Sequence, residues 1–309
     1  MPPLVSIITP SYNQADFLEE TLCSVLDQDY PNLEYIVVDG ASTDGSQDII
    51  KKYAQRLAWW VSEPDQGQGE AINKGLSKAN GEIVAWLNSD DIYLPGAISE
   101  AVAAFETCPQ AVLVYGNMLA IDSQGQTLNK LNYRQLDLTD LLCFEIIGQP
   151  AVFMQRDQLT AAGGLDTSFH FMLDHLLWIK MASQGELRHM EKTWASARYH
   201  PMAKNRAQAA QFGLEAFRIL DWAQEQPELQ PVLSRVWKRA QASAQRVNAR
   251  YLLDGGQPWK ALRHWFRALV KYPPTALARL NILVSALLNL LGLGKLRSTI
   301  LRRRQEKYS

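Results

Sequence analysis

Short apolar runs alternate with amphipathic stretches from residue 4 to residue 115. The apolar runs have the length and the Val and Ile content of buried strands, and the first is expected to stop at Thr9-Pro10-Ser11. In the amphipathic stretches apolar residues recur at helical spacing, as Leu18, Leu22 and Val25 do. The expected strands cover residues 4–8, 35–39, 58–62, 82–87 and 111–115, and the expected helices cover 14–28, 46–56, 68–79 and 95–107. Strands that alternate with helices predict βαβ units and a mostly parallel sheet.

The pattern changes after residue 115. An antiparallel excursion is expected over 115–131, with its turn at Asp122–Gly125. A short strand at 151–154, helices near 156–162 and 172–184, and a strand near 186–190 should follow. From Asn205 onward the signals are helical. We therefore expect an α/β domain over residues 1–204, with halves at 1–115 and 116–204, and a helical region over 205–309.

Composition places the chain among ordinary globular proteins. Hydrophobic residues make up 47% and charged residues 20% of the 309 positions, and this composition excludes a chain that is disordered over its whole length. The 31 basic and 32 acidic residues give a net charge of −1, so no overall field attracts nucleic acid. Three cysteines are too few for a disulfide framework or a structural zinc site, and the first residues lack a signal-peptide pattern. Both observations predict a cytoplasmic protein.

Acidic residues follow three of the expected strands. Asp39, Asp65 and the pair Asp90-Asp91 each come near the end of an apolar run. In open parallel sheets ligands bind outside the carboxyl ends of the strands, so the three turns are expected to converge on one crevice. A single Asp in such a place often only caps the next helix. Three such turns together favour a binding site.

The turn Asn88-Ser89-Asp90-Asp91 carries the sharpest signal. Its adjacent carboxylates repel each other, and the end of a strand should not bury them deeply enough to neutralise them. A divalent cation would relieve the repulsion, because it prefers oxygen ligands. Two carboxylates are an incomplete ligand set, so substrate phosphates and water would supply the rest. The turn therefore predicts a site for a metal ion and a diphosphate.

Three segments together resemble the family 2 glycosyltransferases of the GT-A fold. They are PLVSIITPSYN, LEYIVVDGASTDGS and SEPDQGQGEAINKGLSKANGEIVAWLNSDD, and the resemblance extends over residues 4–200 in order and spacing. It implies a GT-A domain with a mostly parallel central sheet, followed by a C-terminal helical appendage. It also implies an enzyme that uses Mn²⁺ or Mg²⁺ and a nucleotide diphosphate sugar, commonly a UDP-sugar. Such an enzyme transfers the sugar with inversion to the hydroxyl of a glycan or lipid-linked acceptor, as in surface polysaccharide assembly.

The resemblance assigns roles to residues of the half at 1–115. Those implied to bind the nucleotide are Pro10, Ser11, Tyr12, Asp39, Asp65, Asn88 and Ser89. Asp39 matches the carboxylate that recognises the base, and an ionised carboxylate can accept a hydrogen bond from the uracil N–H. Asp90 matches the metal-binding acid, with Asp91 as its neighbour. The chain departs from the family at Asn88, where Asp is commoner, although an amide still accepts a hydrogen bond.

The half at 116–204 is implied to bind the acceptor and to supply the base. Asp174 falls where the family keeps the acid that takes the proton of the acceptor hydroxyl, and a plain helix cap is the other interpretation. Gln149-Pro150 matches a segment of the acceptor cleft. His200 and Lys204 are implied to bind the leaving diphosphate, and ordinary loop residues are the alternative.

Two other functions are alternatives for these residues. A sugar-nucleotide nucleotidyltransferase usually needs a Gly-rich basic loop after the first strand, and Pro10–Gln14 is not such a loop. A catalytically silent carbohydrate- or nucleotide-binding module has no need of a base. The presence of Asp174 together with Asp39, Asp90 and Asp91 argues against that module.

The segment 277–294 is strongly apolar, and six Lys and Arg residues follow it up to residue 307. Polar and Gly residues within the apolar part make it a poor membrane-spanning helix. Two interpretations stay open. Residues 277–307 contact the anionic inner face of a membrane as an amphipathic helix, or the apolar part packs as a core helix.

Overall fold

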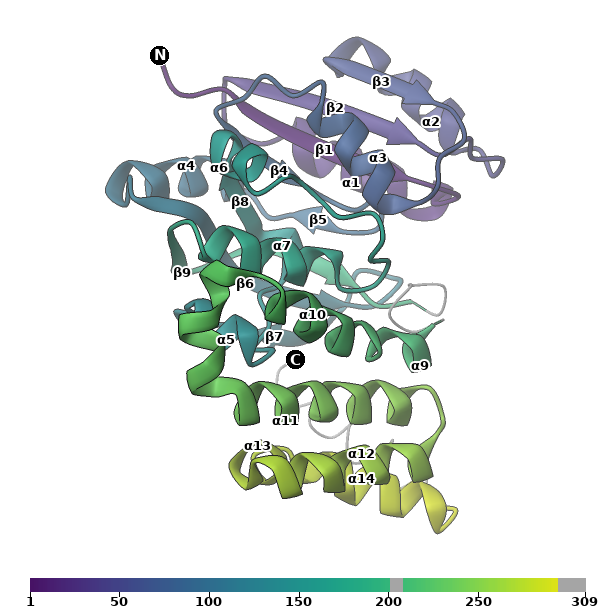
Figure 1. Ribbon diagram of the computed structural model, residues 1–309. Helices are drawn as coiled ribbons and strands as arrows, with labels where there is room; N and C mark the ends of the chain where they lie inside the picture. The colour runs from purple at the N-terminus through teal and green to yellow at the C-terminus, as the bar shows by residue number, and fades with distance from the viewer. Residues whose placement is uncertain (201–207, 294–309) are drawn as a thin grey trace. The chain divides into compact units, whose positions relative to one another are not determined.

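The computed structural model describes residues 1–200 and 208–293. A mixed sheet of nine strands forms the centre of the first 200 residues, with the strand order β3-β2-β1-β4-β8-β6-β9-β5 and with β7 paired to β6 (Figure 1). The strands are β1 (Val5–Ser11), β2 (Leu33–Asp39), β3 (Trp59–Ser62), β4 (Ile83–Trp86), β5 (Ile92–Tyr93), β6 (Ala111–Ile121), β7 (Thr127–Leu131), β8 (Val152–Gln155) and β9 (Glu186–Arg198). Strands β1 to β4 are mutually parallel, as is the long pair β6–β9, and the remaining pairs are antiparallel. The expected α/β architecture and the antiparallel excursion at 115–131 are confirmed.

Strand β1 extends three residues beyond the predicted stop and includes Pro10. It pairs with β4 only as far as Ile8, whereas its pairing with β2 continues to Ser11. The carbonyls of Ile8 and Ser11 accept from Leu87 and Gly40, on the β4 and β2 sides respectively. Successive residues of a strand direct their backbone groups to opposite sides, so the nitrogen of Pro10 points to the same side as the Ile8 carbonyl, where β4 has already ended. The N–H that proline lacks therefore costs no hydrogen bond between strands.

Helices cover both faces of the sheet, which explains why the central strands β1, β4 and β8 are buried at almost every position. The helices of this part are α1 (Ala15–Leu26), α2 (Ser46–Tyr53), α3 (Gln68–Leu76), α4 (Ala97–Thr107), α6 (Arg156–Ala161) and α7 (Leu173–Ala182). Short 3₁₀ turns, η1 (Ala54–Arg56) and η2 (Gln149–Ala151), lie between them. Buried residues of α1, α2 and α4 pack with the alternate strand residues that include Val5, Ile7 and Val37.

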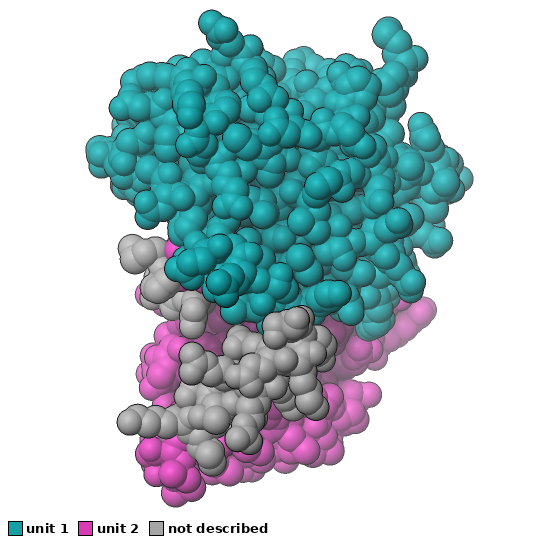
Figure 2. Space-filling model, turned by 180° about the vertical axis from the view of Figure 1, so that it is seen from behind, with its two compact units in different colours: residues 1–135, 147–198 teal, residues 136–146, 199–309 magenta. Residues whose placement is uncertain are grey.

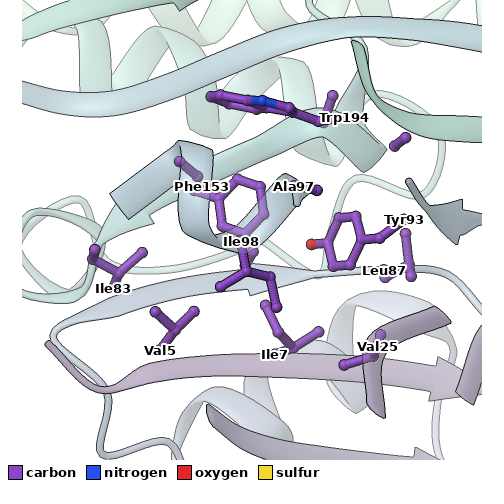
Figure 3. Close-up of a cluster of buried hydrophobic side chains, with 14 of the residues drawn as sticks. Val5, Ile7, Val25, Ile83, Leu87, Tyr93, Ala97, Ile98, Phe153 and Trp194 are labelled. Atoms are coloured by element: carbon purple, nitrogen blue, oxygen red, sulfur yellow. The ribbon is translucent and has the colours of Figure 1, made fainter. Parts of the chain in front are cut away.

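This first core is closed by aromatic side chains (Figure 3). Phe153 stacks on Tyr93 with ring centroids 5.4 Å apart and meets the edge of Trp194 at 5.7 Å. The indole N–H of Trp194 donates to Glu100 Oε2 on α4 at 2.8 Å. Strand β8, strand β9 and helix α4 are thereby tied to one cluster.

The opposite face of the sheet packs against α3 and α7. A Cβ built on Gly75 of α3 would lie 2.4 Å from Ile8 Cγ2 of β1, so only glycine allows the helix to lie this close. On α7, Trp178 stacks on Trp86 of β4 with centroids 5.4 Å apart and planes at 22°. This stack fixes α7 against the strand that leads into the Asn88–Asp91 turn.

The chain divides into two compact units, coloured separately in Figure 2. The sheet unit comprises residues 1–135 and 147–198, and the helical unit comprises 136–146 and 199–309. Elements of the helical unit are α5 (Leu138–Leu142), α9 (Ala209–Phe212), α10 (Glu215–Gln224), η3 (Pro227–Leu229), α11 (Gln230–Asp254), α12 (Pro258–Lys271), α13 (Pro273–Leu277) and α14 (Leu280–Leu290). The helical character predicted after residue 205 is confirmed for 208–293.

The segment 136–146 joins the helical unit although it interrupts the sequence of the sheet unit. Arg239 of α11 forms an ion pair with Asp140 at 3.6 Å, and Arg246 Nη2 donates to the carbonyl of Phe144 at 3.0 Å. Burial lowers the pKa of Arg246.

Among the described helices, none combines the length and the apolar character that crossing a bilayer requires.

We predict that Trp194→Ala lowers the free energy of unfolding by about 3–5 kcal/mol, because it empties a large buried site in the core of Figure 3. Urea unfolding followed by circular dichroism measures the effect. Trp259→Ala, at a position that is 72% exposed, is the control and should change stability by no more than about 0.5 kcal/mol. Equal effects of the two substitutions would contradict the description of the core.

Candidate functional site

The loops that follow β1, β2 and β3 meet at the carboxyl edge of the parallel strands. A Cβ built on Gly40, directly after β2, would lie 2.9 Å from Asp65 Oδ2 and 3.2 Å from Tyr12 Cδ2. A side chain at position 40 would force these two residues apart. The Tyr12 ring is 63% exposed, so the junction presents an aromatic surface to solvent. Asp65 in turn accepts a hydrogen bond from the N–H of Gly67 at 2.8 Å, which shapes the start of α3.

Asp39 and Ser11 lie side by side at the ends of β2 and β1, below that surface. Asp39 is fully buried: its Oδ2 accepts from the Ser42 N–H at 2.9 Å and from the Ser62 hydroxyl at 2.6 Å, and its Oδ1 accepts from the Ser42 hydroxyl. These hydrogen bonds fix the Asp39 carboxylate within the loop, and its contact with a nucleotide base stays a prediction. The buried Ser11 hydroxyl has no hydrogen-bond partner within the described residues.

The Asp90-Asp91 turn is organised by Arg198, the last residue of β9. The N–H of Arg198 donates to Asp91 Oδ1 at 3.0 Å, and its Nε donates to the carbonyl of Asp90 at 3.0 Å. Its guanidinium also pairs with Glu20 at 2.5 Å and lies 4.9 Å from the centre of the Phe17 ring. One buried side chain thus joins α1, β9 and the acidic turn.

Asp91 is buried, which corrects the expectation that neither acid of the pair is deeply buried. Burial and the neighbouring charge of Asp90 raise the pKa of Asp91 well above its usual range, against the lowering effect of hydrogen bonds from Arg198 and Asn88. Asp90 keeps part of its surface exposed. The two acids of the pair therefore have different environments.

Asn88 connects the acidic turn to two other elements. Its Nδ2 donates to Asp91 Oδ2 and to Gln149 Oε1, both at 3.1 Å, and its Oδ1 accepts from Gln68 Nε2 at 2.6 Å. Gln149 also donates to the carbonyl of Trp86 at 2.7 Å. An amide at position 88 can donate and accept at once, whereas a carboxylate could only accept. These contacts give a physical reason for the departure from Asp at this position.

Asp174 lies in the first turn of α7, as predicted, and its Oδ1 accepts from the N–H of His175 at 2.8 Å. It is one helical turn before Trp178, so both side chains occupy the same face of α7 as the stack on Trp86. The loop before α7 is held to α3 by Asn73, which donates to the carbonyl of Leu165 at 2.8 Å and accepts from its N–H at 3.2 Å. The helix that carries Asp174 is therefore fixed from two sides.

The other predicted site residues divide between the two units. Ser89, Gln149 and Pro150 are buried in the sheet unit. Gln149 bonds to Asn88 of the acidic turn, and the contact of Gln149 and Pro150 with an acceptor stays a prediction. His200 belongs to the helical unit and is buried, and Lys204 lies outside the described residues.

A divalent cation would find an incomplete ligand set here. Among residues 1–200 and 208–293, no three His, Cys, Asp or Glu side chains gather into a metal-binding group. Asp90 offers a partly exposed carboxylate beside a second acid, and hard oxygen atoms of this kind suit Mg²⁺ or Mn²⁺. The residues therefore fit a cation whose remaining ligands come from a bound diphosphate and water.

Three residues that hold the site together are absent from the sequence-based set: Arg198, Gln68 and Asn73. Arg198 acts on residues more than a hundred positions away, and no local pattern marks such a contact. Gln68 and Asn73 both lie within the segment that carries the resemblance, but helical spacing alone gives them no role.

Comparisons with known proteins identify the family of the chain. A family model described as "Glycosyl transferase family 2" matches residues 6–160. The glycosyltransferase TuaG of Bacillus subtilis (strain 168), named for teichuronic acid biosynthesis, is 38% identical over 163 residues, which cover 50% of this chain and 64% of TuaG. An uncharacterized glycosyltransferase of Haemophilus influenzae is 34% identical over 161 residues, covering 51% of this chain and 64% of that protein. The chain thus spans less than two thirds of the length of either relative.

Two solved structures share the fold. Staphylococcus aureus TarS 1–349 in complex with UDP-GlcNAc superposes with a TM-score of 0.61 at 18% identity, covering 87% of this chain and 91% of that one. The mannosyltransferase PcManGT of Pyrobaculum calidifontis, in complex with GDP-Man and Mn²⁺, gives a TM-score of 0.63 at 22% identity, covering 98% and 85%. With half of the sequence matched by the family model and the same architecture in these structures, the chain belongs to glycosyl transferase family 2 and has the GT-A fold.

Proposed function

We propose that this chain transfers a sugar from a nucleotide diphosphate sugar to a hydroxyl acceptor, with inversion at the anomeric carbon. The observation that supports it most directly is the connection between the acidic turn and α7. Asn88 bonds to Gln149, Gln149 bonds to the carbonyl of Trp86, and Trp86 stacks on Trp178 of the helix that carries Asp174. The acidic turn and the candidate base are thereby connected through packed and hydrogen-bonded side chains, as the positioning of two substrates requires.

The donor nucleotide is proposed to lie against the junction of Tyr12, Gly40 and Asp65. The exposed Tyr12 ring offers a face on which a base can stack, and Asp65 holds the loop that borders it. Asp39 shapes the neighbouring loop through Ser42 and Ser62. Ser11 lies beside Asp39 with an unsatisfied hydroxyl, and we assign Pro10 and Ser11 to the floor of this pocket.

We favour a UDP-sugar as the donor. TarS was solved with UDP-GlcNAc and PcManGT with GDP-Man, so relatives with this fold bind nucleotide sugars of both kinds. TuaG, the relative named for teichuronic acid biosynthesis, supports a place in surface polysaccharide assembly. Because nucleotide sugars are the donors, we propose that transfer takes place on the cytoplasmic side.

Asp90 is the proposed metal ligand, and Asp91 is the residue that positions it. Arg198 binds both Asp91 and the Asp90 carbonyl, and the partly exposed Asp90 is the acid that we propose to face the donor. A bound Mn²⁺ or Mg²⁺ would neutralise charge on the diphosphate as it leaves. Ser89 and Asn88 complete the turn, and His200 and Lys204 are proposed to bind the same diphosphate.

Asp174 is the proposed base. As the acceptor oxygen attacks the anomeric carbon, its proton passes to the Asp174 carboxylate, and the bond between that carbon and the diphosphate oxygen breaks. Attack opposite to the leaving diphosphate inverts the configuration. A silent binding module would bind donor without this step, and a nucleotidyltransferase would form the sugar nucleotide from a nucleoside triphosphate and a sugar phosphate. The products therefore distinguish the three functions.

We predict that Asp90→Asn weakens Mn²⁺-dependent binding of UDP-GlcNAc by about 100-fold or more. Substitution of residues that only hydrogen-bond to metal ligands already lowers metal affinity about 10–100-fold, and a ligand itself should matter at least as much. EDTA should have the same effect on the unmodified protein. Calorimetric titration measures both. Asp48→Asn, which changes an exposed acid on α2, is the control and should bind normally. Binding that persists in EDTA would refute the metal site.

We predict that Asp174→Asn lowers the transfer rate about 10²–10⁴-fold while donor affinity stays unchanged, since a general base acts only in the transition state. Single-turnover transfer from UDP-GlcNAc in the presence of a polysaccharide acceptor fraction measures the rate. Asp157→Asn is the matched control, because Asp157 occupies the first turn of α6 and is exposed. Transfer at the normal rate by the Asp174 variant would place the base elsewhere.

We predict that Asn88→Asp lowers the free energy of unfolding at pH 7 by about 1–3 kcal/mol, because the substituted group cannot donate to Asp91 or Gln149. Proximity to Asp91 would raise the pKa of the introduced carboxyl, so the loss should shrink as the pH falls and that carboxyl is protonated. Urea unfolding at several pH values measures the effect. Asn132→Asp, at an exposed position, is the control, and equal stabilities would argue against the Asn88 network.

A further inference from the structure

Charge is distributed very unevenly along this nearly neutral chain. From Gly255 to Ser309 the sequence has eleven Lys and Arg residues and one acidic residue, Glu306. The preceding 254 residues have 20 basic and 31 acidic residues. The stretch 255–293, which contains α12, α13 and α14, has no acidic residue at all. This end of the chain therefore attracts anionic surfaces, although the whole protein does not.

Helix α12 combines exposed apolar and exposed basic residues. Trp259, Phe266 and Val270 are 72%, 52% and 85% exposed, and their spacing of seven and four places them on one face. The opposite face, which includes Leu262 and Trp265, packs into the core of the helical unit. Exposed basic residues adjoin the apolar face: Lys260, Arg263, Arg267 and Lys271.

Helix α14 carries a second exposed apolar face. Leu280, Val284, Leu287 and Leu291 follow one another at spacings of four, three and four, and each is at least 46% exposed. Ile282 and Ala286 are buried on the other side, in the same core as α12. The helix thus packs as core on one face while it leaves a leucine-rich face open. Residues 294–307 of the predicted membrane segment lie outside the described residues.

We propose that the two exposed faces, defined by Trp259, Phe266 and Val270 on α12 and by Leu280, Val284, Leu287 and Leu291 on α14, bind a bilayer surface that contains anionic lipid. Apolar side chains with a flanking aromatic residue suit the boundary between headgroups and acyl chains, and the adjoining Lys and Arg residues suit anionic headgroups. The absence of acidic residues from 255–293 disfavours the same segment of a second copy as the occupant, because like charges would be brought together. This binding does not depend on the proposed transfer reaction.

The test is sedimentation of the full chain with vesicles. The protein should pellet with vesicles of phosphatidylcholine and phosphatidylglycerol in equal parts and stay in the supernatant with phosphatidylcholine alone. Arg263→Gln combined with Arg267→Gln should weaken the partition roughly 5-fold for each basic residue removed. The matched control, Lys51→Gln combined with Lys52→Gln, removes two exposed charges from α2 and should bind like the unmodified chain.

Leu287→Ser should also reduce binding, whereas Leu214→Ser, at an equally exposed apolar position outside the two faces, should not. Light scattering of the same variants measures oligomeric state. Equal binding to neutral and anionic vesicles, no binding to either, or a dimer lost in the Leu287 variant would overturn the proposal. UDP-GlcNAc binding, measured in parallel, should be unchanged in every variant, so a failure of the membrane proposal is separable from a failure of the transfer proposal.

Discussion

Burial of the Asp91 carboxylate constrains everything that surrounds the candidate site. A carboxylate out of contact with water is stable only where donors surround it, and the fold supplies them from distant parts of the chain. Arg198 donates from the end of β9 and Asn88 donates from the turn itself. The position of Asp90 follows from these contacts, because its carbonyl is bound by the same arginine. The position of the exposed acid of the pair is therefore set by the contacts of the buried acid.

The contacts of Asn88 extend this constraint across the sheet. Asn88 bonds to Gln68 at the start of α3 and to Gln149 in the segment that leads into β8. Asn73, one and a half turns further along α3, holds the loop that leads to α7. The neutral amides permit a connected set of donors and acceptors that a cluster of carboxylates could not form. The earlier and later parts of the sheet unit are thus joined in one hydrogen-bonded structure.

Local patterns in the sequence predicted much of the sheet unit. Apolar strand runs, helical spacing and the acids at the strand ends all have short-range signatures, and the structure confirms the elements that they predict. Burial at a strand end was harder to predict, because Asp91 and Asp39 are enclosed by Arg198, Ser42 and Ser62 through tertiary contacts. The prediction that β1 stops at Pro10 failed for a related reason. A proline ends a strand only where a neighbouring strand would need the N–H that proline lacks. The apolar segment after residue 277 fitted both a core and a surface helix, and α14 has a face of each kind.

A crystal structure of the protein with UDP-GlcNAc and Mn²⁺ tests the central claim most directly. We expect the uracil ring to lie against Tyr12 and the diphosphate to lie at the Asn88–Asp91 turn. An anomalous peak should mark a manganese ion bonded to the Asp90 carboxylate. The sugar should lie between that turn and Asp174. A nucleotide bound elsewhere, or a manganese peak away from Asp90 with the crevice filled only by water, would contradict the account.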